Sequence, residues 1–295
     1  MTVHANPGSQ TLTLRLSFRG LTTRLRRDWK AILPLLPAIL LVLVTVLSPF
    51  IERFNPQQVS GNARLAPNAT YWFGTDSVGF DIFSRTIAAF RVDMLIALLV
   101  TVAATALGLA LGIVIGTRES ERSVFGWAAR TFTRGVDLVE AIPSVIFGVV
   151  VAGLFGANAV SLSIALTFVL LQNQFRLTRV EVLKVRTDAY LDAARMAGQS
   201  DARILFRHVL PNSCQPALVN ASLIFGNSIV ILASLGFLGV GLHPPTPEWG
   251  SMISTSLSDL MLGRWWGAIF PAIALCLTVI VAGTASRAIR RLASV

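Results

Sequence analysis

The sequence contains few charged residues. Asp, Glu, Lys and Arg make up 14% of its 295 residues, whereas a typical soluble domain carries about 25%. Too few remain to cover a water-exposed surface, and 54% of the residues are hydrophobic. Several apolar runs approach the roughly 20 residues that a helix needs to cross a bilayer. These runs are continuous rather than alternating, which argues against a transmembrane β-barrel. We therefore predict an all-α, polytopic membrane protein.

Cysteine is also scarce, and motifs that carry chemistry are missing. Cys214 falls in the polar middle of the chain and Cys276 in the last apolar run, so we expect neither a disulfide nor a metal site. His243 has no partners at metal-ligand spacing. The sequence contains no phosphate-binding loop of the form GxxxxGK(S/T), and no Ser/His/Asp arrangement stands out. We expect no catalytic residue and no cofactor in this chain.

Basic residues, by contrast, are abundant, and the net charge is +10. Nucleic acid is one possible partner, but in a membrane protein Lys and Arg hold loops on the cytoplasmic side, so we expect no nucleic acid. The apolar runs predict six transmembrane helices, at Ala31–Phe50, Met94–Thr117, Val136–Phe155, Ala159–Leu171, Pro216–Leu238 and Gly267–Ala285. Six crossings place both termini on the same side of the membrane.

The distribution of Lys and Arg identifies that side. Twenty of them lie in the N-terminal segment, the Arg118–Arg134 loop, the 175–215 loop and the C-terminal tail, and five lie on the other side. This bias predicts that both termini are cytoplasmic. The predicted organisation is a cytoplasmic segment (1–30), a first transmembrane helix with its outer loop (31–92), a five-helix core (93–285) that includes the cytoplasmic loop 175–215, and a cytoplasmic tail (286–295).

Two patterns within the runs concern packing. Gly108, Gly112 and Gly116 repeat every four residues and predict a smooth strip where a neighbouring helix approaches closely. The amides at 172–174, which end the fourth run, predict a helix that continues inside the protein rather than facing lipid.

The loop 175–215 is the longest polar segment in the middle of the chain. We predict a helix over Val180–Arg207 that is broken at Gly198, a common helix C-cap. A short helical stretch, Ala202–Val209, follows, and Pro211 is predicted to end it before the next crossing. Two interpretations fit this pattern. One is an amphipathic helix on the inner leaflet, and the other is a rigid docking element for a second protein.

Asp192-Ala193-Ala194, Gly198 and Leu210-Pro211 resemble the EAA loop of the permease subunits of ABC importers. In that family the loop forms a coupling helix that docks on the ATPase. The resemblance implies an ABC type I importer permease fold and assigns ATPase coupling to Asp192, Ala193, Ala194, Arg195, Met196, Gly198, Leu210 and Pro211. Asp192 replaces the usual Glu, which puts any ion pair with the ATPase in doubt.

Further stretches resemble the oligopeptide, dipeptide and nickel branch of that family. They are Gly74-Thr75-Asp76, Gly79, Asp81, Ser84-Arg85, Arg91, His208–Asn212, Ser234–Gly241 and Pro244–Gly250. The chain departs from the branch at Phe80, where Arg is usual, at Ala89, where Gly is common, and at Asp93, where Ser is common. The long basic N-terminus resembles the second of the two permease chains.

The resemblance implies a permease subunit of an ATP-driven importer for dipeptides or oligopeptides in the bacterial inner membrane. Its implied partners are a second homologous permease, two ATPase domains on the cytoplasmic side and an external solute-binding protein. ATP and Mg are then expected on the ATPases and not on this chain. Import of nickel or another small solute is an alternative. Alternatives of other classes are a secondary transporter driven by an ion gradient and a non-transporting membrane scaffold.

Several polar residues remain as candidates. We predict that Asn220, Asn227 and Ser228 line the pathway, and that Asp76, Asp81, Arg85 and Trp249 contact partners at the outer loops. Trp249 fits either an aromatic belt or an interface with the binding protein. Three acidic residues are predicted to lie at helix N-termini, where a negative charge interacts favourably with the helix dipole: Asp93, Asp137 and Glu140. An alternative for the pair Asp137 and Glu140 is acid/base chemistry.

Overall fold

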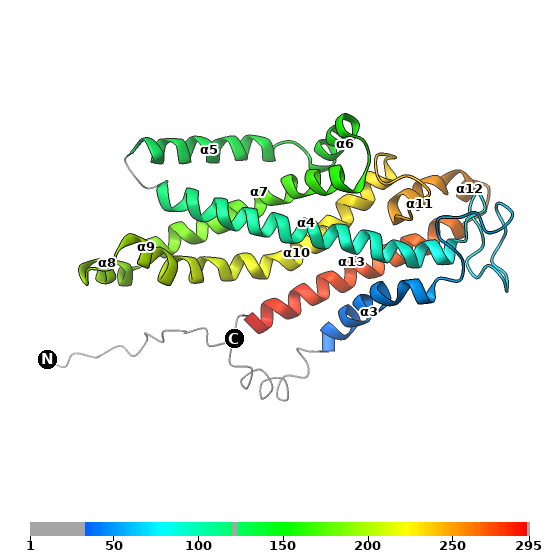
Figure 1. The fold of residues 1–295 in the computed structure, drawn as a ribbon, viewed down its shortest axis with the longest axis horizontal. Helices are drawn as coiled ribbons and strands as arrows, with labels where there is room; N and C mark the ends of the chain where they lie inside the picture. The colour runs from blue at the N-terminus through cyan, green and yellow to red at the C-terminus, as the bar shows by residue number, and fades with distance from the viewer. Residues whose placement is uncertain (1–32, 120–122, 294–295) are drawn as a thin grey trace.

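The computed structural model describes residues 33–119 and 123–293. These residues form helices and contain no β-strand (Figure 1). The elements are η1 (Leu33–Leu35), α3 (Leu36–Ile51), α4 (Ile82–Arg118), α5 (Val124–Glu140), α6 (Ser144–Phe155), α7 (Ala159–Arg186), α8 (Ala189–Met196), α9 (Asp201–Ile204), η2 (Leu205–Val209), α10 (Leu210–Phe237), α11 (Trp249–Thr255), α12 (Leu257–Met261) and α13 (Trp266–Ala293). The predicted all-α class is confirmed. The cytoplasmic segment predicted at 1–30 lies outside the described residues.

Five segments are long and apolar enough to span a membrane: Leu33–Ile51, α4, α7, the run Asp201–Phe237 and Trp266–Leu292. The helices α5 and α6 pass the same test only together, and they meet at an angle of 90°. The predicted third crossing is therefore not one continuous helix over 136–155, although the two helices together can still form a broken span. Pro143 has no backbone N–H and disfavours helical geometry at the residue before it, so the chain breaks where α5 ends.

The loop predicted at 118–134 is also wrong, because α5 begins at Val124. The Ser123 hydroxyl caps this helix by accepting the Gly126 N–H at 3.2 Å. Similarly, α4 begins at Ile82 rather than Met94. Asp81 caps it by accepting the Ser84 N–H at 2.8 Å. The predicted boundary between residues 92 and 93 therefore falls inside a helix.

The glycine strip on α4 packs against α7, as predicted. A Cβ atom added to Gly108 would lie 2.7 Å from the Gln174 side chain, and one added to Gly112 would lie 2.5 Å from Thr178 Cβ. A Cβ atom added to Gly116 would lie 3.0 Å from the Val182 side chain. The three α7 partners repeat every four residues, as the glycines do, so the two helices approach along one shared strip.

Pro211 does not end a helix. It lies in the first turn of α10 and follows the π-helical turn η2. The Leu210 N–H bonds to the Leu205 carbonyl, five residues back. This wider turn carries the chain from α9 into α10 without a break. The helical run therefore extends from Asp201 to Phe237, beyond the predicted fifth crossing on its N-terminal side.

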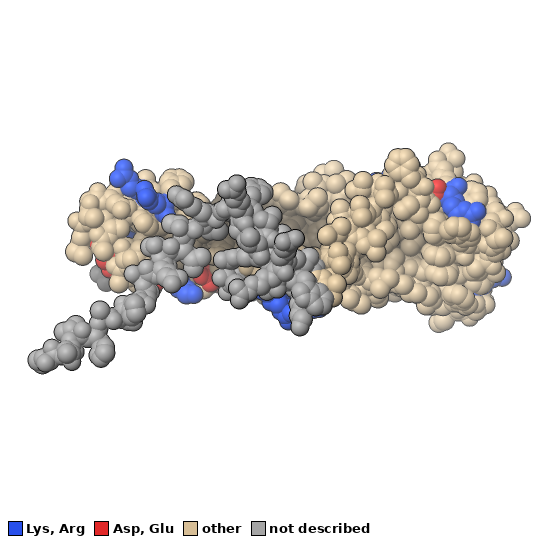
Figure 2. Space-filling view, turned by 90° about the horizontal axis from the view of Figure 1, so that it is seen from below, with Lys and Arg blue, Asp and Glu red and all other residues tan. Residues whose placement is uncertain are grey.

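The two ends of the molecule differ from the region between them in their charge. The loop 52–81 covers one end, α8 and α9 lie at the other, and both the start of α3 and the end of α13 point away from the 52–81 loop (Figure 1). In Figure 2, charged side chains lie at both ends and beside the grey segment near the middle, and on this face a wide band between the grey segment and the 52–81 end carries none. Such an uncharged band is the surface that a bilayer requires.

Candidate functional site

The segment from α8 to α9 is a helix–turn–helix closed by Gly198. This glycine has φ +77, a left-handed conformation that suits glycine. The Gly198 N–H bonds to the Arg195 carbonyl at 2.9 Å, and the Gln199 N–H bonds to the Ala194 carbonyl at 3.2 Å. This pair of bonds is a Schellman motif. The predicted C-cap at Gly198 is confirmed, although α8 itself is shorter than the helix predicted over 180–207.

One face of α8 is anchored in the protein. Leu191 is fully buried and Ala194 is nearly so. They form an apolar cluster with Val182, Val185, Ile204 and Val209, against which Ile113 of α4 also packs. The cluster joins α8 to α4, α7 and the start of the α10 run, so a force on α8 reaches several crossing helices at once.

The opposite face of α8 is open. Met196 is 84% exposed, and Asp192, Ala193 and Arg195 are exposed as well. Arg195 Nη1 donates to Asp192 Oδ1 at 2.8 Å. Asp192 therefore has an intrachain partner on the surface, where such a pair contributes little to stability. Phe206 of η2 is a second large apolar side chain that is exposed in this part of the chain, at 67%.

Polar contacts tie α8 to the base of α10. Asn212 Nδ2 donates to the Tyr190 hydroxyl at 3.0 Å, His208 Nε2 and Gln199 Oε1 lie 3.2 Å apart, and the Tyr190 and His208 rings meet edge to face at 5.8 Å. Leu210 and Pro211, at the start of α10, are half-buried. These contacts give the segment a fixed surface that is connected to the transmembrane helices.

The predicted pathway residues do not form one common face. Asn220 is half-buried, Asn227 is exposed and Ser228 is fully buried. Ser228 Oγ donates to the Phe225 carbonyl at 2.7 Å within its own helix, so its hydroxyl already has a partner in this chain. Asn220 Nδ2 donates to Gln174 Oε1 at 2.8 Å. The pathway-lining role of all three residues stays a prediction.

Most of the residues predicted to make outer contacts have buried side chains in this chain, and their contacts with partners stay predictions. Asp81 and Arg85 are each 2% exposed. Arg85 Nη1 donates to the carbonyls of Pro56 and Pro245, both at 3.0 Å, and so fastens two outer loops together. Asp76 is half-buried, and its Oδ1 accepts three backbone N–H groups of its own turn, from residues 78 to 80. Within this chain these residues hold the outer loops together.

Trp249 packs inside this chain, and its two predicted roles, in an aromatic belt or at an interface, stay predictions. It is fully buried, its Nε1 donates to the Thr86 carbonyl at 3.1 Å, and its ring meets Phe90 edge to face at 4.7 Å. The neighbouring Glu248, which sequence reasoning missed, caps α11. Burial raises the pKa of Glu248 to about 7, against the opposing effect of the backbone N–H groups that it accepts.

The acidic residues at helix N-termini also need correction. Asp137 and Glu140 lie in the last turn of α5, not in its first. Glu140 Oε2 accepts from Arg176 Nη1 at 2.7 Å, which accounts for this carboxylate without acid/base chemistry. Asp93 is the twelfth residue of α4, and it faces the N-terminus of α11 instead of that of its own helix.

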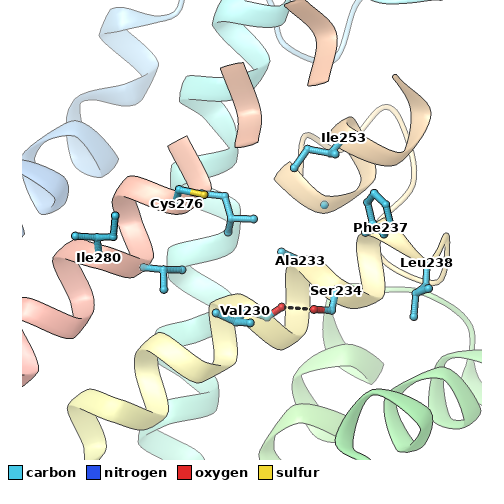
Figure 3. A pocket seen from close by; sticks show the side chains of 11 residues that line it. Val230, Ala233, Ser234, Phe237, Leu238, Ile253, Cys276 and Ile280 are labelled. Carbon is cyan, nitrogen blue, oxygen red and sulfur yellow. Dashed lines mark hydrogen bonds between the residues drawn. The ribbon is translucent and has the colours of Figure 1, made fainter. Parts of the chain in front are cut away.

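An apolar cavity of about 600 Å³ opens between α10, α11 and α13. Val230, Phe237, Ile253 and Ile280 are among its lining residues (Figure 3). Ser234 Oγ lies in the wall and donates to the Val230 carbonyl at 2.8 Å, so the hydroxyl is already bonded. Cys276 also lines the cavity and is a free thiol. With this lining the cavity accepts apolar groups.

Comparison with known proteins identifies the family. The family of binding-protein-dependent transport system inner membrane components matches residues 108–294, more than half of the chain. The dipeptide transport system permease protein DppC of Escherichia coli (strain K12) is 38% identical over 262 residues, which cover 86% of this chain and 85% of that protein. The probable D,D-dipeptide transport system permease protein DdpC of the same strain is 33% identical over 82% of this chain and 79% of that protein.

A third relative is the glutathione transport system permease protein GsiD of Shigella sonnei (strain Ss046), which is 31% identical over 87% of this chain and 83% of that protein. All three relatives are named as permease proteins of transport systems, and the family match includes the whole α8–α9 segment. The chain belongs to the family of binding-protein-dependent transport system inner membrane components.

Proposed function

We propose that this chain is one of two permease subunits of an ATP-driven importer for dipeptides or other short peptides. The observation that carries the proposal is the α8–α9 segment, which is rigid, exposed on one face and packed on the other against three of the spanning segments. The peptide class rests on the relatives, whose names specify dipeptides, D,D-dipeptides and glutathione.

The cytoplasmic partner is an ATPase pair that docks on the exposed face of α8. Met196 and Phe206 supply apolar anchors, and the Asp192–Arg195 pair supplies charges that can exchange partners on docking. Two small residues, Ala193 and Ala197, leave room for a close approach. The ATPases hold ATP and Mg, and this chain converts their closure into movement of its helices.

The remaining partners are a second, homologous permease and an external solute-binding protein. The translocation pathway forms between the two permeases, and Asn227, exposed on α10, lines it. The binding protein delivers substrate to the end that the 52–81 loop covers. The excess of Lys and Arg supports a cytoplasmic position, in a bacterial cell, for the α8–α9 end and for both termini.

Transport by the reconstituted complex tests this function. The two permeases, the ATPases and the binding protein are assembled in proteoliposomes, and uptake of a labelled dipeptide, glutathione or nickel is measured. We expect dipeptide uptake that requires enclosed ATP and the binding protein and that persists when ionophores dissipate ion gradients. Uptake that follows an ion gradient without ATP would instead support a secondary transporter. Uptake of nickel, with no uptake of the dipeptide or glutathione, would instead support the alternative that the importer carries nickel or another small solute.

A further inference from the structure

Two carboxylates that the transport role does not use meet where α11 begins. Asp93 of α4 is 1% exposed, and Glu248, the residue before α11, is fully buried. Trp249 lies between them in the structure: its backbone N–H donates to Asp93 Oδ2 at 3.3 Å, and Glu248 immediately precedes it in the chain. Two like charges in one buried site repel each other strongly unless one is neutralised.

Glu248 is held in a fixed position. Its two oxygens accept the N–H groups of Gly250 at 2.6 Å and of Ser251 at 2.7 Å. The backbone encloses it, because a Cβ atom on Gly236 would collide with Glu248 Oε2 and one on Gly241 would lie 3.3 Å from the same oxygen. Glu248 cannot relieve repulsion by swinging away without dismantling the cap of α11.

Asp93 is only half satisfied. Its Oδ2 accepts the single long bond from Trp249, and its Oδ1 is buried without a hydrogen-bond partner. The hydroxyl of Thr86, on the same helix, is likewise buried without a partner. An ionised carboxylate oxygen that lacks a donor costs several kcal/mol in a buried site, whereas a protonated oxygen is neutral and can itself donate.

No cation among the described residues compensates the pair. Arg85 directs its guanidinium to loop carbonyls, and Arg91 is exposed and paired with Glu52. On α12, Asp259 is paired with Arg64 and Arg264. The sequence of α10 contains no charged residue or histidine, and that of α13 contains none before Arg287. The described chain also has no group of three or more His, Cys, Asp or Glu that would hold a metal ion.

We propose that Asp93 and Glu248 bind one proton between them, and that this proton holds α11 against α4. The site takes up a proton from water to form one carboxyl and one carboxylate, and releases it again to water; no other bond forms or breaks. The raised pKa of Glu248, about 7, agrees with a proton that is retained near neutral pH. Loss of the shared proton leaves two adjacent negative charges. We expect their repulsion to separate α11 and the loop 239–248 from α4, which loosens the outer end of the permease.

The proton itself is observable by infrared spectroscopy on the assembled complex. A buried protonated carboxyl gives a C=O stretch distinct from that of carboxylates, and difference spectra between acidic and alkaline samples isolate it. We expect this band in the wild-type complex at pH 6 and its loss as the pH passes about 7. In the Asp93→Asn complex we expect the midpoint of the loss to fall by roughly one pH unit or more, because the repulsion on Glu248 is gone.

Two further variants complete the test. The double variant Asp93→Asn/Glu248→Gln removes both carboxyls and is expected to lack the band at every pH. Asp259→Asn is the matched control, since it removes a buried carboxylate of the same outer end that has arginine partners, and it is expected to leave the band unchanged. A wild-type complex without the band at pH 6, or a double variant that keeps it, would overturn the proposal.

A second readout covers the case in which a variant assembles poorly. Amide hydrogen exchange of residues 249–255 in the wild-type complex is compared at pH 6 and pH 8, after correction for the intrinsic pH dependence of exchange. We expect faster corrected exchange at pH 8, and no such difference in Asp93→Ser. Equal corrected exchange at both pH values in the wild type contradicts the proposal, as does protection at pH 8 that depends on added sodium or calcium, which would indicate a bound metal cation.

Discussion

The side-chain amides of Gln174 on α7 and Asn220 on α10 join the two helices inside the bundle. Asn220 Nδ2 donates to Gln174 Oε1 at 2.8 Å, and Gln174 Nε2 donates to the Ala217 carbonyl at 2.7 Å. Gln174 also fills the space opposite Gly108 of α4. One amide thus connects three helices, at a site where its hydrogen-bonding groups have no access to water.

Replacing Gln174 with Leu removes both bonds while nearly keeping the volume. Asn220 and the Ala217 carbonyl lose their partner, and we expect a loss of about 1–2 kcal/mol in the free energy of unfolding. Thermal unfolding of the purified protein in detergent measures it. Asn227→Ala serves as the control, because Asn227 is exposed in the chain, and we expect its melting temperature to match the wild type. Equal melting temperatures for Gln174→Leu and the wild type would show that the amide bridge is not needed.

Replacing Gly112 with Val tests the strip between α4 and α7. A Cβ atom at this position would lie 2.5 Å from Thr178 Cβ, so the helices must separate, and overpacking of this kind costs about 1–3 kcal/mol. We expect a lower melting temperature and reduced yield of folded protein. Gly153→Ala is the matched control on α6, where an added Cβ meets nothing within 4 Å and helix propensity favours Ala by up to about 1 kcal/mol. A Gly112 variant as stable as the Gly153 variant would refute close packing along the strip.

Replacing Gly198 with Val tests the turn after α8. An added Cβ at Gly198 meets nothing within 4 Å, but the residue has φ +77, a conformation that costs a residue with a Cβ roughly 1–2 kcal/mol. We expect the Val variant to insert normally and to hydrolyse ATP with little uptake of peptide. Asn tolerates the left-handed region, so Gly198→Asn should keep most of the uptake. Normal uptake by the Val complex would count heavily against a coupling role for α8.

The stability of the protein should depend on pH through Glu248. Its pKa is about 7 in the folded protein and 4.5 in the unfolded chain, so the folded state gains stability from the protonated acid. This contribution is fully present below pH 4.5, declines as the pH rises toward 7, and is lost above that. The pKa difference corresponds to about 3 kcal/mol.

Melting temperatures measured between pH 4.5 and pH 8 check this dependence. We expect the wild type to lose stability over that interval and the Glu248→Gln variant to show a much flatter curve. A Gln variant that keeps the full slope would assign the dependence to another group.

The local pattern of the sequence was sufficient to predict the all-α class, the α4 glycine strip and the cap at Gly198. Each of these depends on spacing along one helix or on the conformation of one residue. The coupling segment was likewise recognisable, because its residues lie within one short stretch of chain. Pro143 was the one local indication that the helix breaks between α5 and α6. The apolar residues on both sides of Pro143 nevertheless favoured one continuous helix.

The sequence by itself determined that this chain is a helical membrane protein of a known transport family, because long apolar runs and short motifs are local properties. Only the tertiary structure decided which polar residues are accessible. Asp81, Arg85 and Trp249 have the composition of a surface loop, yet they are buried because segments distant in sequence fold over them. The meeting of Asp93 with Glu248 joins positions 155 residues apart, and no spacing rule along the chain reports it. Burial and pairing depend on which helices become neighbours, and the packing of the whole bundle determines that.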